Sequence, residues 1–319
     1  MKNPILAVDI GGTKVAAGLV DRSGRILVTK RAPMAARGSS DEGLAAVFAA
    51  LHAVLRDRRA RRARAIGVSV PGWIDTRRGV VLSAPNITCW QNLPLRREIE
   101  NRYDLPVRIA NDANAGALAE AKFGSATGAK ISFYVTLGTG IGTGLVINGR
   151  IYSGMAGGAT EGGHVSIDLH GPVCGCGKRG CIEMYASGTA VGRRARDLVT
   201  ERDPNGSQML DLAGGEIDKI NAHIVSQAAT SGDSLAREIL HGAADALGIW
   251  LGGMIDLLEP GVIVLGGGFS AVMMPLLPRV REKLKVWASN PRRDEIPIIS
   301  ARYGAESALV GAAALCIKR

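Results

Sequence analysis

Apolar residues fall into short runs along the first part of the chain, and turn-forming residues separate these runs. The runs predict strands at Ile5–Ile10, Lys14–Val20 and residues 25–31. A glycine pair follows the first strand and the cluster at residues 21–24 follows the second, so both connections are predicted to be tight turns. This beginning has the pattern of a β-meander.

After the meander, helical spacing alternates with short buried runs. Helices are predicted at residues 41–55, 95–101 and 113–123, and strands at residues 65–70 and 107–110. A second series has strands at Ile131–Leu137 and residues 144–147, then a long helix at residues 233–258 and a buried strand at residues 262–265. The chain therefore predicts two versions of one α/β plan, with the polar stretch 201–208 as the best candidate for a mobile loop.

With 319 residues, 46% of them hydrophobic, the chain has enough apolar material for two cores. We expect two lobes with a ligand cleft. Aromatic residues make up 4% while glycine numbers 42, which favours a backbone that closes around small polar ligands over a surface that stacks bases.

The formal net charge of +10 raises the question of nucleic-acid binding. Much of this charge comes from the run RDRRARRAR at residues 56–64, which we interpret as a solvated helix face. The first apolar stretch is too short for a signal peptide, and the sequence has no run of about 20 apolar residues that would span a membrane. We expect a cytoplasmic protein without nucleic-acid or membrane partners.

The segment from Asp9 to Lys14 ends a strand in an acidic residue and turns through Gly11 and Gly12 into Thr13. Glycines let backbone N–H groups approach phosphate oxygens, and Thr13 adds a hydroxyl donor. Asp9 is a candidate to hold Mg²⁺ through water. A plain hairpin turn is the alternative for this motif alone.

A second glycine cluster, with Gly138, Thr139 and Gly140, follows the strand Ile131–Leu137. A dinucleotide-binding fold would place such glycines at the start of a helix, but a strand follows here, which argues against that fold. Two glycine hairpins, one per lobe, could grip a phosphate chain. A third cluster contains Gly267 and could leave space for an adenine ring, with a tight turn as the alternative.

Asn111 and Asp112 lie where the strand at residues 107–110 meets the helix at residues 113–123. An acidic residue at such a junction is commonly an N-cap. A carboxylate at the carboxyl end of a strand in an α/β sheet also points into the ligand crevice, and phosphoryl transfer to an alcohol needs a group that accepts the hydroxyl proton. Asp112 is our candidate catalytic base.

The most specific signal is His164 with Cys174, Cys176 and Cys181, with glycines between the thiols. Three thiolates and one imidazole complete a tetrahedral zinc site. Because protein fills all four positions, the predicted Zn²⁺ is structural and orders its loop. The other two cysteines lie far away in the sequence, so no disulfide framework is expected.

Glu161 and Glu183 flank the same loop, so the metal could aim two carboxylates at one pocket. Carboxylates accept hydrogen bonds from sugar hydroxyls, and the remaining imidazole nitrogen of His164 could add another contact. Solvated surface glutamates are the alternative for each residue alone.

In this order, the motifs resemble those of the ROK family of bacterial sugar kinases and sugar-responsive repressors, over essentially the whole chain. The matching segments are DIGGTK at residues 9–14, PGWID at 71–75, APN at 84–86, NDANAGALAE at 111–120, GTGIGTG at 138–144, EGGH at 161–164 and CGCGKRGCIE at 174–183. Each motif is weak alone, whereas the ordered set is specific.

The resemblance implies an actin-like, hexokinase-type duplicated α/β fold of two lobes with an interlobe active-site cleft. It implies an N-terminal lobe of residues 1–112, joined by the C-terminal helix at residues 305–319. The larger lobe would comprise residues 113–304, with the zinc-binding loop at residues 161–183. Family members are commonly homodimers or homotetramers.

The resemblance also implies roles for individual residues, with Asp112 as the catalytic base and the histidine and three cysteines named above at zinc. The implied sugar ligands are Asn86, Asn111, Asp112, Glu161, His164 and Glu183. The implied phosphate contacts of ATP are Gly11, Gly12, Thr13, Lys14, Gly138 and Thr139. Our candidates Asp9, Gly140 and Gly267 complete the site for ATP and its Mg²⁺.

One segment departs from the family pattern, because Thr160 stands where glycine is usual and Gly162 where an aliphatic residue is usual. A β-branched residue before Glu161 and extra backbone freedom at Gly162 would reshape the sugar pocket. This departure affects the prediction of which sugar binds more than the prediction of the reaction.

The expected activity is transfer of the γ-phosphoryl of ATP to the 6-hydroxyl of a hexose, with glucose favoured on family frequency. N-acetylmannosamine, N-acetylglucosamine, fructose and allose stay open as substrates. Polyphosphate as the donor and a catalytically silent sugar sensor are further alternatives. A family repressor would place a helix-turn-helix domain ahead of the first strand, which begins here at Ile5 and leaves no room for one.

Overall fold

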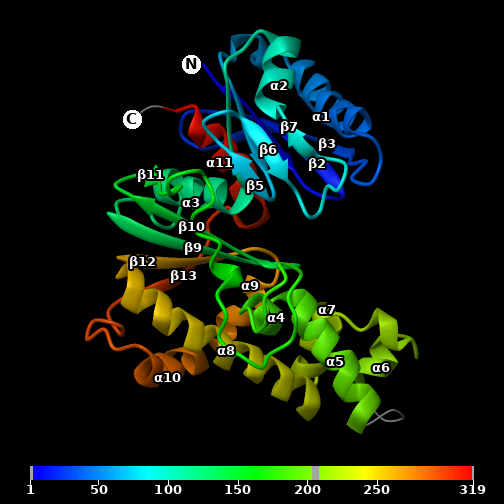
Figure 1. Ribbon diagram of the computed structural model, residues 1–319, viewed down its shortest axis with the longest axis vertical. Helices are drawn as coiled ribbons and strands as arrows, with labels where there is room; N and C mark the ends of the chain where they lie inside the picture. The colour runs from blue at the N-terminus through cyan, green and yellow to red at the C-terminus, as the bar shows by residue number, and fades with distance from the viewer. Residues whose placement is uncertain (1–2, 203–207, 318–319) are drawn as a thin grey trace. The chain divides into compact units, whose positions relative to one another are not determined.

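The computed structural model describes residues 3–202 and 208–317, so most of the predicted mobile loop at residues 201–208 lies outside the described residues. The chain divides into two compact units (Figure 1). Unit 1 comprises Met1–Tyr134, Thr143–Thr160 and Ala301–Arg319, and unit 2 comprises Val135–Gly142 and Glu161–Ser300. Both units contain helices and strands, in agreement with the predicted two-lobe α/β fold.

Unit 1 is built on a five-stranded sheet with the strand order β3-β2-β1-β4-β8. Its strands are β1 (Ile5–Ile10), β2 (Lys14–Val20), β3 (Ile26–Pro33), β4 (Ile66–Val70) and β8 (Val107–Asn111). The first three pair antiparallel, which confirms the predicted meander, while β4 runs parallel to β1 and β8 runs parallel to β4. Parallel strands end at one edge of a sheet, so Asp9, Ser69 and Asn111 share that edge.

Alternate residues of β1 face different helices. Leu6 and Val8 join the core cluster that contains residues of α1 (Ser40–Leu55), whereas Ala7 packs with residues of α11 (Ser307–Leu315). A Cβ at Gly67 of β4 would overlap the backbone of α11, so glycine permits this close approach. The last helix of the chain is thereby packed on the first sheet.

The remaining elements of unit 1 are short. They are η1 (Arg58–Arg62), β5 (Trp73–Asp75), β6 (Val80–Ser83), β7 (Gln91–Leu93), α2 (Leu95–Tyr103), α3 (Asp112–Phe123), β11 (Arg150–Ile151) and η5 (Gly304–Glu306). β5, β6 and β7 form a separate three-stranded sheet.

A buried carboxylate ties the end of the chain to α3. Glu120 is fully buried in α3. Its oxygens accept hydrogen bonds from the N–H groups of Ser125 (2.9 Å), Arg302 (3.0 Å) and Tyr303 (3.0 Å) and from the Ser307 hydroxyl (3.1 Å). A buried charge needs such partners, and they fix the start of α11 against α3.

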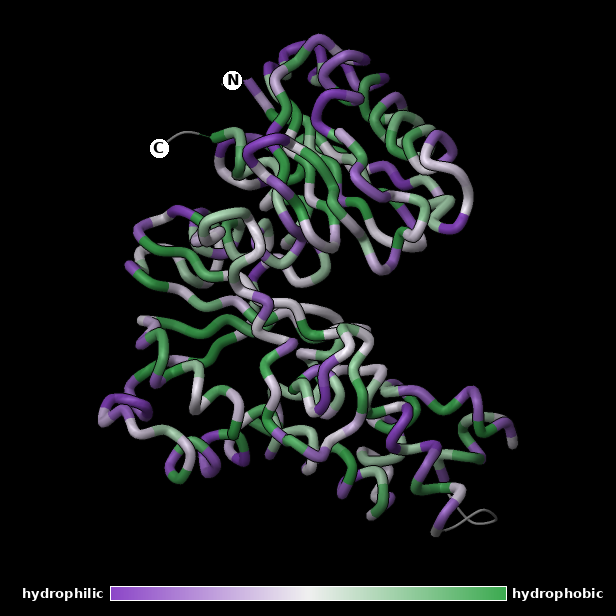
Figure 2. The backbone as a smooth tube through the Cα atoms, in the orientation of Figure 1, coloured by the Kyte–Doolittle hydropathy of each residue, from purple (hydrophilic) through white to green (hydrophobic). Residues whose placement is uncertain are grey.

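The second five-stranded sheet has the order β11-β10-β9-β12-β13. Its longer strands are β9 (Ile131–Leu137), β10 (Ile141–Ile147), β12 (Val262–Gly266) and β13 (Ile298–Ser300). β10 begins at Ile141, whereas the strand was predicted at residues 144–147. Residues 141–143 of the glycine-rich segment also adopt strand conformation. Figure 2 shows the strands of both five-stranded sheets as largely apolar stretches.

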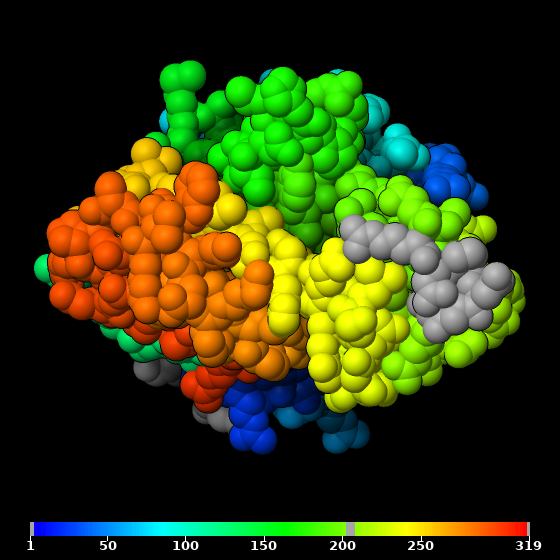
Figure 3. All heavy atoms as spheres, turned by 90° about the horizontal axis from the view of Figure 1, so that it is seen from below, coloured from blue at the N-terminus to red at the C-terminus, as the bar shows by residue number. Residues whose placement is uncertain are grey.

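Helices make up most of the rest of unit 2. They are η2 (Gly162–His164), α4 (Glu183–Ala186), α5 (Gly188–Arg202), α6 (Gln208–Leu212), η3 (Ile217–Lys219), α7 (Ala222–Thr230), α8 (Ser234–Leu258), α9 (Ser270–Met273), η4 (Met274–Leu276) and α10 (Leu277–Trp287). The predicted long helix is confirmed as α8, which packs beside α10; Figure 3 shows the two in yellow and orange. Within the described ranges, no helix is both long and apolar enough to cross a membrane.

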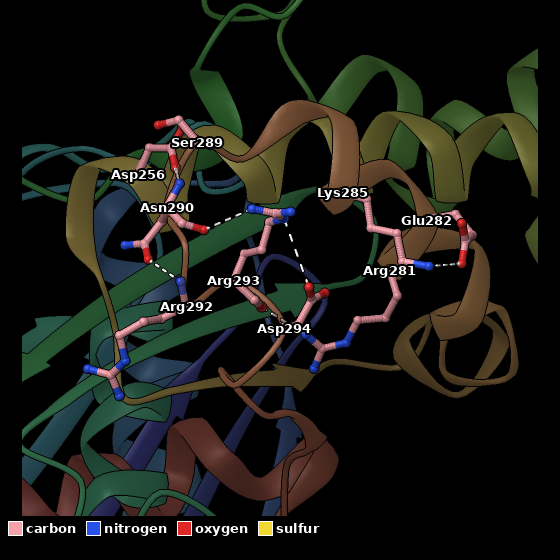
Figure 4. A network of polar contacts seen from close by, with 9 residues as sticks. All are labelled: Asp256, Arg281, Glu282, Lys285, Ser289, Asn290, Arg292, Arg293 and Asp294. Atoms are coloured by element: carbon pink, nitrogen blue, oxygen red, sulfur yellow. Dashed lines mark hydrogen bonds and ion pairs between the residues drawn. The ribbon is translucent and has the colours of Figure 1, made fainter.

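A polar network holds the loop that leaves α10 (Figure 4). Asp256 of α8 accepts hydrogen bonds from the N–H groups of Ser289 (2.9 Å) and Asn290 (2.8 Å), and these bonds hold the pKa of Asp256 below its ordinary value. Arg281 donates to the carbonyls of Arg293 (3.2 Å) and Ile296 (2.7 Å). The loop before β13 is therefore fixed at both of its ends.

We predict that Glu120→Ala lowers the free energy of unfolding by about 3 kcal/mol, because it leaves buried donors unpaired. Glu120→Gln keeps one acceptor oxygen and should cost less. Glu282→Ala, which removes an exposed ion pair with Lys285, should change stability by less than about 0.5 kcal/mol. Urea unfolding measures all three, and equal losses in Glu120→Ala and Glu282→Ala would contradict the anchoring role.

Candidate functional site

The carboxyl edge of the unit 1 sheet holds a half-buried acidic group. Asp9 of β1 accepts a hydrogen bond from the Ser69 hydroxyl (2.9 Å), since the parallel register places the two residues side by side. Burial, with a smaller contribution from the charge of Asp112, raises the pKa of Asp9 to about 7. Acidic groups with a pKa raised in this way are a common feature of functional sites.

The candidate phosphate turn follows Asp9 directly. Gly11 donates its N–H to the Lys14 carbonyl (2.9 Å), which closes the turn between β1 and β2. A Cβ at Gly12 would lie 2.7 Å from the carbonyl oxygen of Asn86, so glycine is needed for the turn to pack there. The structure thus brings the turn and one predicted sugar ligand together, while Thr13 and Lys14 are exposed.

Asn111 and Asp112 form the junction of β8 and α3. Asn111 is the N-cap, because its side-chain oxygen accepts from the N–H groups of Ala113 (2.9 Å) and Asn114 (3.3 Å). Its amide nitrogen donates to the Gly72 carbonyl (3.3 Å). The Asp112 carboxylate accepts from the Ala113 N–H (2.9 Å), and burial raises its pKa. Asn111 therefore positions the helical turn on which Asp112 lies.

In unit 2, the second glycine turn meets a carboxylate. Glu183, the first residue of α4, accepts a hydrogen bond from the Ile141 N–H (2.8 Å). A Cβ at Gly140 would overlap this carboxylate, so the contact requires glycine. Gly138 donates its N–H to the Gly140 carbonyl (2.9 Å) and closes the turn. A predicted phosphate contact, Gly140, and a predicted sugar ligand, Glu183, are therefore adjacent within unit 2.

His164 and three cysteines gather beside Glu183. The ligand atoms of His164, Cys174, Cys176 and Cys181 all lie within 4.8 Å of one another. The sulfurs of Cys176 and Cys181 are 3.7 Å apart. A zinc tetrahedron with Zn–S bonds of about 2.3 Å has an edge of roughly 3.8 Å. The donor set and its spacing therefore fit Zn²⁺.

The imidazole of His164 has a defined orientation in this cluster. Its Nδ1 lies 3.5 Å from the Cys174 sulfur, which makes Nδ1 the nitrogen that faces the metal position. Nε2 is then the nitrogen directed to a second partner. Glu161 lies at the start of the same η2 turn, where its carbonyl accepts the His164 N–H (3.0 Å).

A pocket of about 610 Å³ lies beside the second glycine turn, within unit 2. Gly138 and Thr139 form one wall, and Gly188 and Asn221 lie at the helix starts that form two others. Several of the lining residues are glycine or alanine, and their small size leaves room for a ligand. A concave space with a few polar groups suits a small organic molecule such as a nucleoside.

In the third glycine cluster, two neighbouring glycines have different roles. Gly267 has a φ of 81° and shapes the turn after β12, while Gly268 lines the pocket. Sequence reasoning missed the contributions of Gly188 and Asn221. Asn221 is an N-cap that accepts from the N–H groups of α7, and an Asn before a helical run was the available signal.

Thr160, which departs from the family pattern, adopts a φ of 70°. This is the left-handed region that favours glycine, and it is costly for a β-branched residue. The Thr160 hydroxyl donates to the Asn114 side-chain oxygen (3.2 Å), and the Thr160 carbonyl accepts from the Thr143 hydroxyl. Polar contacts within unit 1 thus hold the strained residue directly before Glu161.

The chain is similar to known proteins over nearly its whole length. The model of the ROK family matches residues 5–319. A glucokinase of Streptomyces coelicolor is 36% identical over 311 residues, which are 97% of this chain and 96% of that protein. A glucokinase of Thermotoga maritima is 33% identical over 319 residues, which are 100% of this chain and 98% of that protein.

A solved structure shows the same fold. The crystal structure of a ROK family glucokinase from Streptomyces griseus in complex with glucose and AMPPNP has a TM-score of 0.85, with 35% identity and 98% of both chains covered. The architecture is therefore the two-lobe α/β fold of sugar kinases. Within that class, the chain belongs to the ROK family.

Asp9 predicts a pH dependence of stability. Its folded pKa of about 7 lies above its ordinary value of 3.8, so the protonated carboxyl stabilises the fold at low pH and this contribution is lost as the pH rises through about 7. We predict that Asp9→Asn reduces the fall in Tm between about pH 5 and about pH 7.5 in metal-free buffer. Asp218→Asn, an exposed control, should follow the wild type, and equal curves for all three proteins would refute the assignment.

The strain at Thr160 predicts an order of stability for two variants. Thr160→Gly should be more stable than Thr160→Ala by about 1 kcal/mol, because both variants lose the hydroxyl and only glycine relieves the positive φ. Urea unfolding measures the difference. Equal stability of the two variants would show that the position carries no strain.

Proposed function

We propose that the chain is an ATP-dependent hexose kinase that phosphorylates the 6-hydroxyl group, with glucose as the favoured sugar. The observation that carries this proposal is Asp112, a half-buried carboxylate with a raised pKa at the start of α3. A general base works best when its pKa approaches the operating pH. Phosphoryl transfer otherwise depends on positioning and charge stabilisation, which the glycine turns support.

The proposed sugar ligands are described for each unit by itself. Those of unit 1 are Asn86, next to the phosphate turn, and Asn111, next to the base; those of unit 2 are Glu161, His164 and Glu183. The Ile141 N–H orients the Glu183 carboxylate before any sugar binds. Such preorganisation lowers the entropy that binding would otherwise cost.

The donor is proposed to be ATP. The unit 2 pocket beside Gly138 and Thr139 supports ATP over polyphosphate, because polyphosphate carries no base to fill a space of about 610 Å³. When bound with the nucleotide, Mg²⁺ supplies charge neutralisation at the phosphoryl group. Asp9, once ionised, is the residue of unit 1 that would hold this ion.

Zinc is proposed as a structural ion. His164 and the three cysteines would hold it. Glu161 lies just before the first of these residues in the sequence, and Glu183 lies just after the last. The ion would therefore order two carboxylates that we propose as sugar ligands.

For the oligomeric state, a homodimer or homotetramer remains our prediction.

We predict that Asp112→Asn lowers kcat about 10³-fold while the affinity for glucose changes little, because the amide cannot accept the hydroxyl proton. A coupled ADP-release assay and calorimetric titration of glucose measure the two effects. Asp218→Asn is the control and should keep full turnover. Full turnover in Asp112→Asn would remove Asp112 as the base.

We predict that Cys176→Ser loses the zinc and weakens glucose binding about tenfold before the fold is lost, because the loop with Glu161 and Glu183 loosens. Metal analysis, glucose titration and far-UV circular dichroism follow the three properties. Cys89→Ser, outside the cluster, should retain about one zinc per chain. Unchanged glucose affinity in zinc-free protein would contradict the ordering role.

A further inference from the structure

A second pocket, of about 730 Å³, lies within unit 1 at the amino ends of β4 and β8. Its lining includes Arg108 of β8, Lys122 of α3, and Asn148 and Arg150 of the turn between β10 and β11. The end of α11 supplies a wall with Leu315 and Ile317. Figure 1 shows α3, α11 and β11 close together at this place.

The side chains that line the pocket carry positive charge. Three cations line it, and no carboxylate side chain is among its described lining residues. The guanidinium groups of Arg108 and Arg150 are exposed, and within residues 3–202 and 208–317 neither makes a hydrogen bond or ion pair. Cations that converge on a concave surface focus the field and attract anions.

The wall between these arginines is rigid. Lys122 donates hydrogen bonds to the carbonyls of Ala314 (2.8 Å) and Ile317 (2.6 Å), so α3 holds the carboxyl end of α11 in place. Asn148 and Gly149 form a tight turn, with φ values of 52° and 70°. Arg108 and Arg150 belong to paired strands, so an anion would not have to order the backbone that carries them.

The chemistry of the lining indicates the class of ligand. Arginine presents a planar fork that matches phosphate oxygens. The volume exceeds that of a bare phosphate, and Leu315 and Ile317 offer an apolar surface for an organic body. We propose that this pocket is a second binding site, for a small phosphate-bearing organic molecule.

The site is distinct from the phosphate turn of the proposed kinase. Gly11 and Gly12 follow the carboxyl end of β1, whereas Ala65 and Pro106 of the pocket precede the amino ends of β4 and β8. Parallel strands of this length separate their two ends by roughly 15 Å. The proposal stands on the pocket itself, so it holds whether or not the chain is a kinase.

The test is a titration with ribose 5-phosphate at constant ionic strength, followed by the rise in Tm. Inorganic phosphate and ribose serve as separate probes for the two parts of ribose 5-phosphate. The wild type is compared with Arg108→Gln/Arg150→Gln and with Arg56→Gln/Arg58→Gln, a control that removes the same charge from exposed arginines. Lys14→Gln is included because its binding would weaken if ribose 5-phosphate bound at the phosphate turn rather than in this pocket.

Ligand that binds the folded state raises Tm in a saturable manner. We expect saturable binding of ribose 5-phosphate in the wild type, the Arg56→Gln/Arg58→Gln control and Lys14→Gln, and an apparent affinity at least about tenfold weaker in Arg108→Gln/Arg150→Gln. We expect weaker binding of inorganic phosphate and none of ribose. The proposal is overturned by equal responses in all variants, by loss in Lys14→Gln alone, or by no saturable response in the wild type.

Discussion

The buried carboxylate of Glu120 is the contact on which the arrangement of unit 1 depends. It gathers donors from the end of α3, from residues 302–303 and from the start of α11. α3 begins at Asp112, so the helix that Glu120 anchors is also the helix that presents the proposed base. α11 packs on β1, the strand that carries Asp9. A single buried carboxylate therefore supports the elements that carry two acidic residues of the proposed site.

Glycine positions provide the second constraint. At Gly12 and Gly140 the missing side chain lets a turn pack against Asn86 and against Glu183 respectively. The turns are thereby packed closely against polar residues, and the Glu183 carboxylate is fixed by the Ile141 N–H. Thr160 shows the opposite case, since a side chain is kept where the backbone favours glycine and its hydrogen bonds offset part of the strain.

The sequence predicted elements with strong local patterns. The meander, the long helix α8 and the metal cluster depend on alternation, helical spacing and closely spaced ligands, and all were found. The strands β5 to β7 escaped prediction, because each spans only a few residues and several of those are exposed.

Features that join distant segments could not be predicted. Arg302 and Tyr303 lie more than 180 residues beyond Glu120, and no local pattern links them. The unit 2 pocket likewise combines a glycine turn with helix starts from separate parts of the chain. Candidate residues could therefore be named from the sequence one by one, whereas the pockets and the anchoring contacts required the structure.

The most direct measurement is kcat/KM for ATP-dependent phosphorylation across glucose, fructose, allose, N-acetylglucosamine and N-acetylmannosamine, with zinc-replete protein and Mg²⁺, and with polyphosphate as a parallel donor. The account predicts turnover with ATP, and the highest kcat/KM with glucose. Absence of turnover on every sugar, together with measurable sugar binding, would contradict the kinase assignment and identify the chain as a sugar sensor.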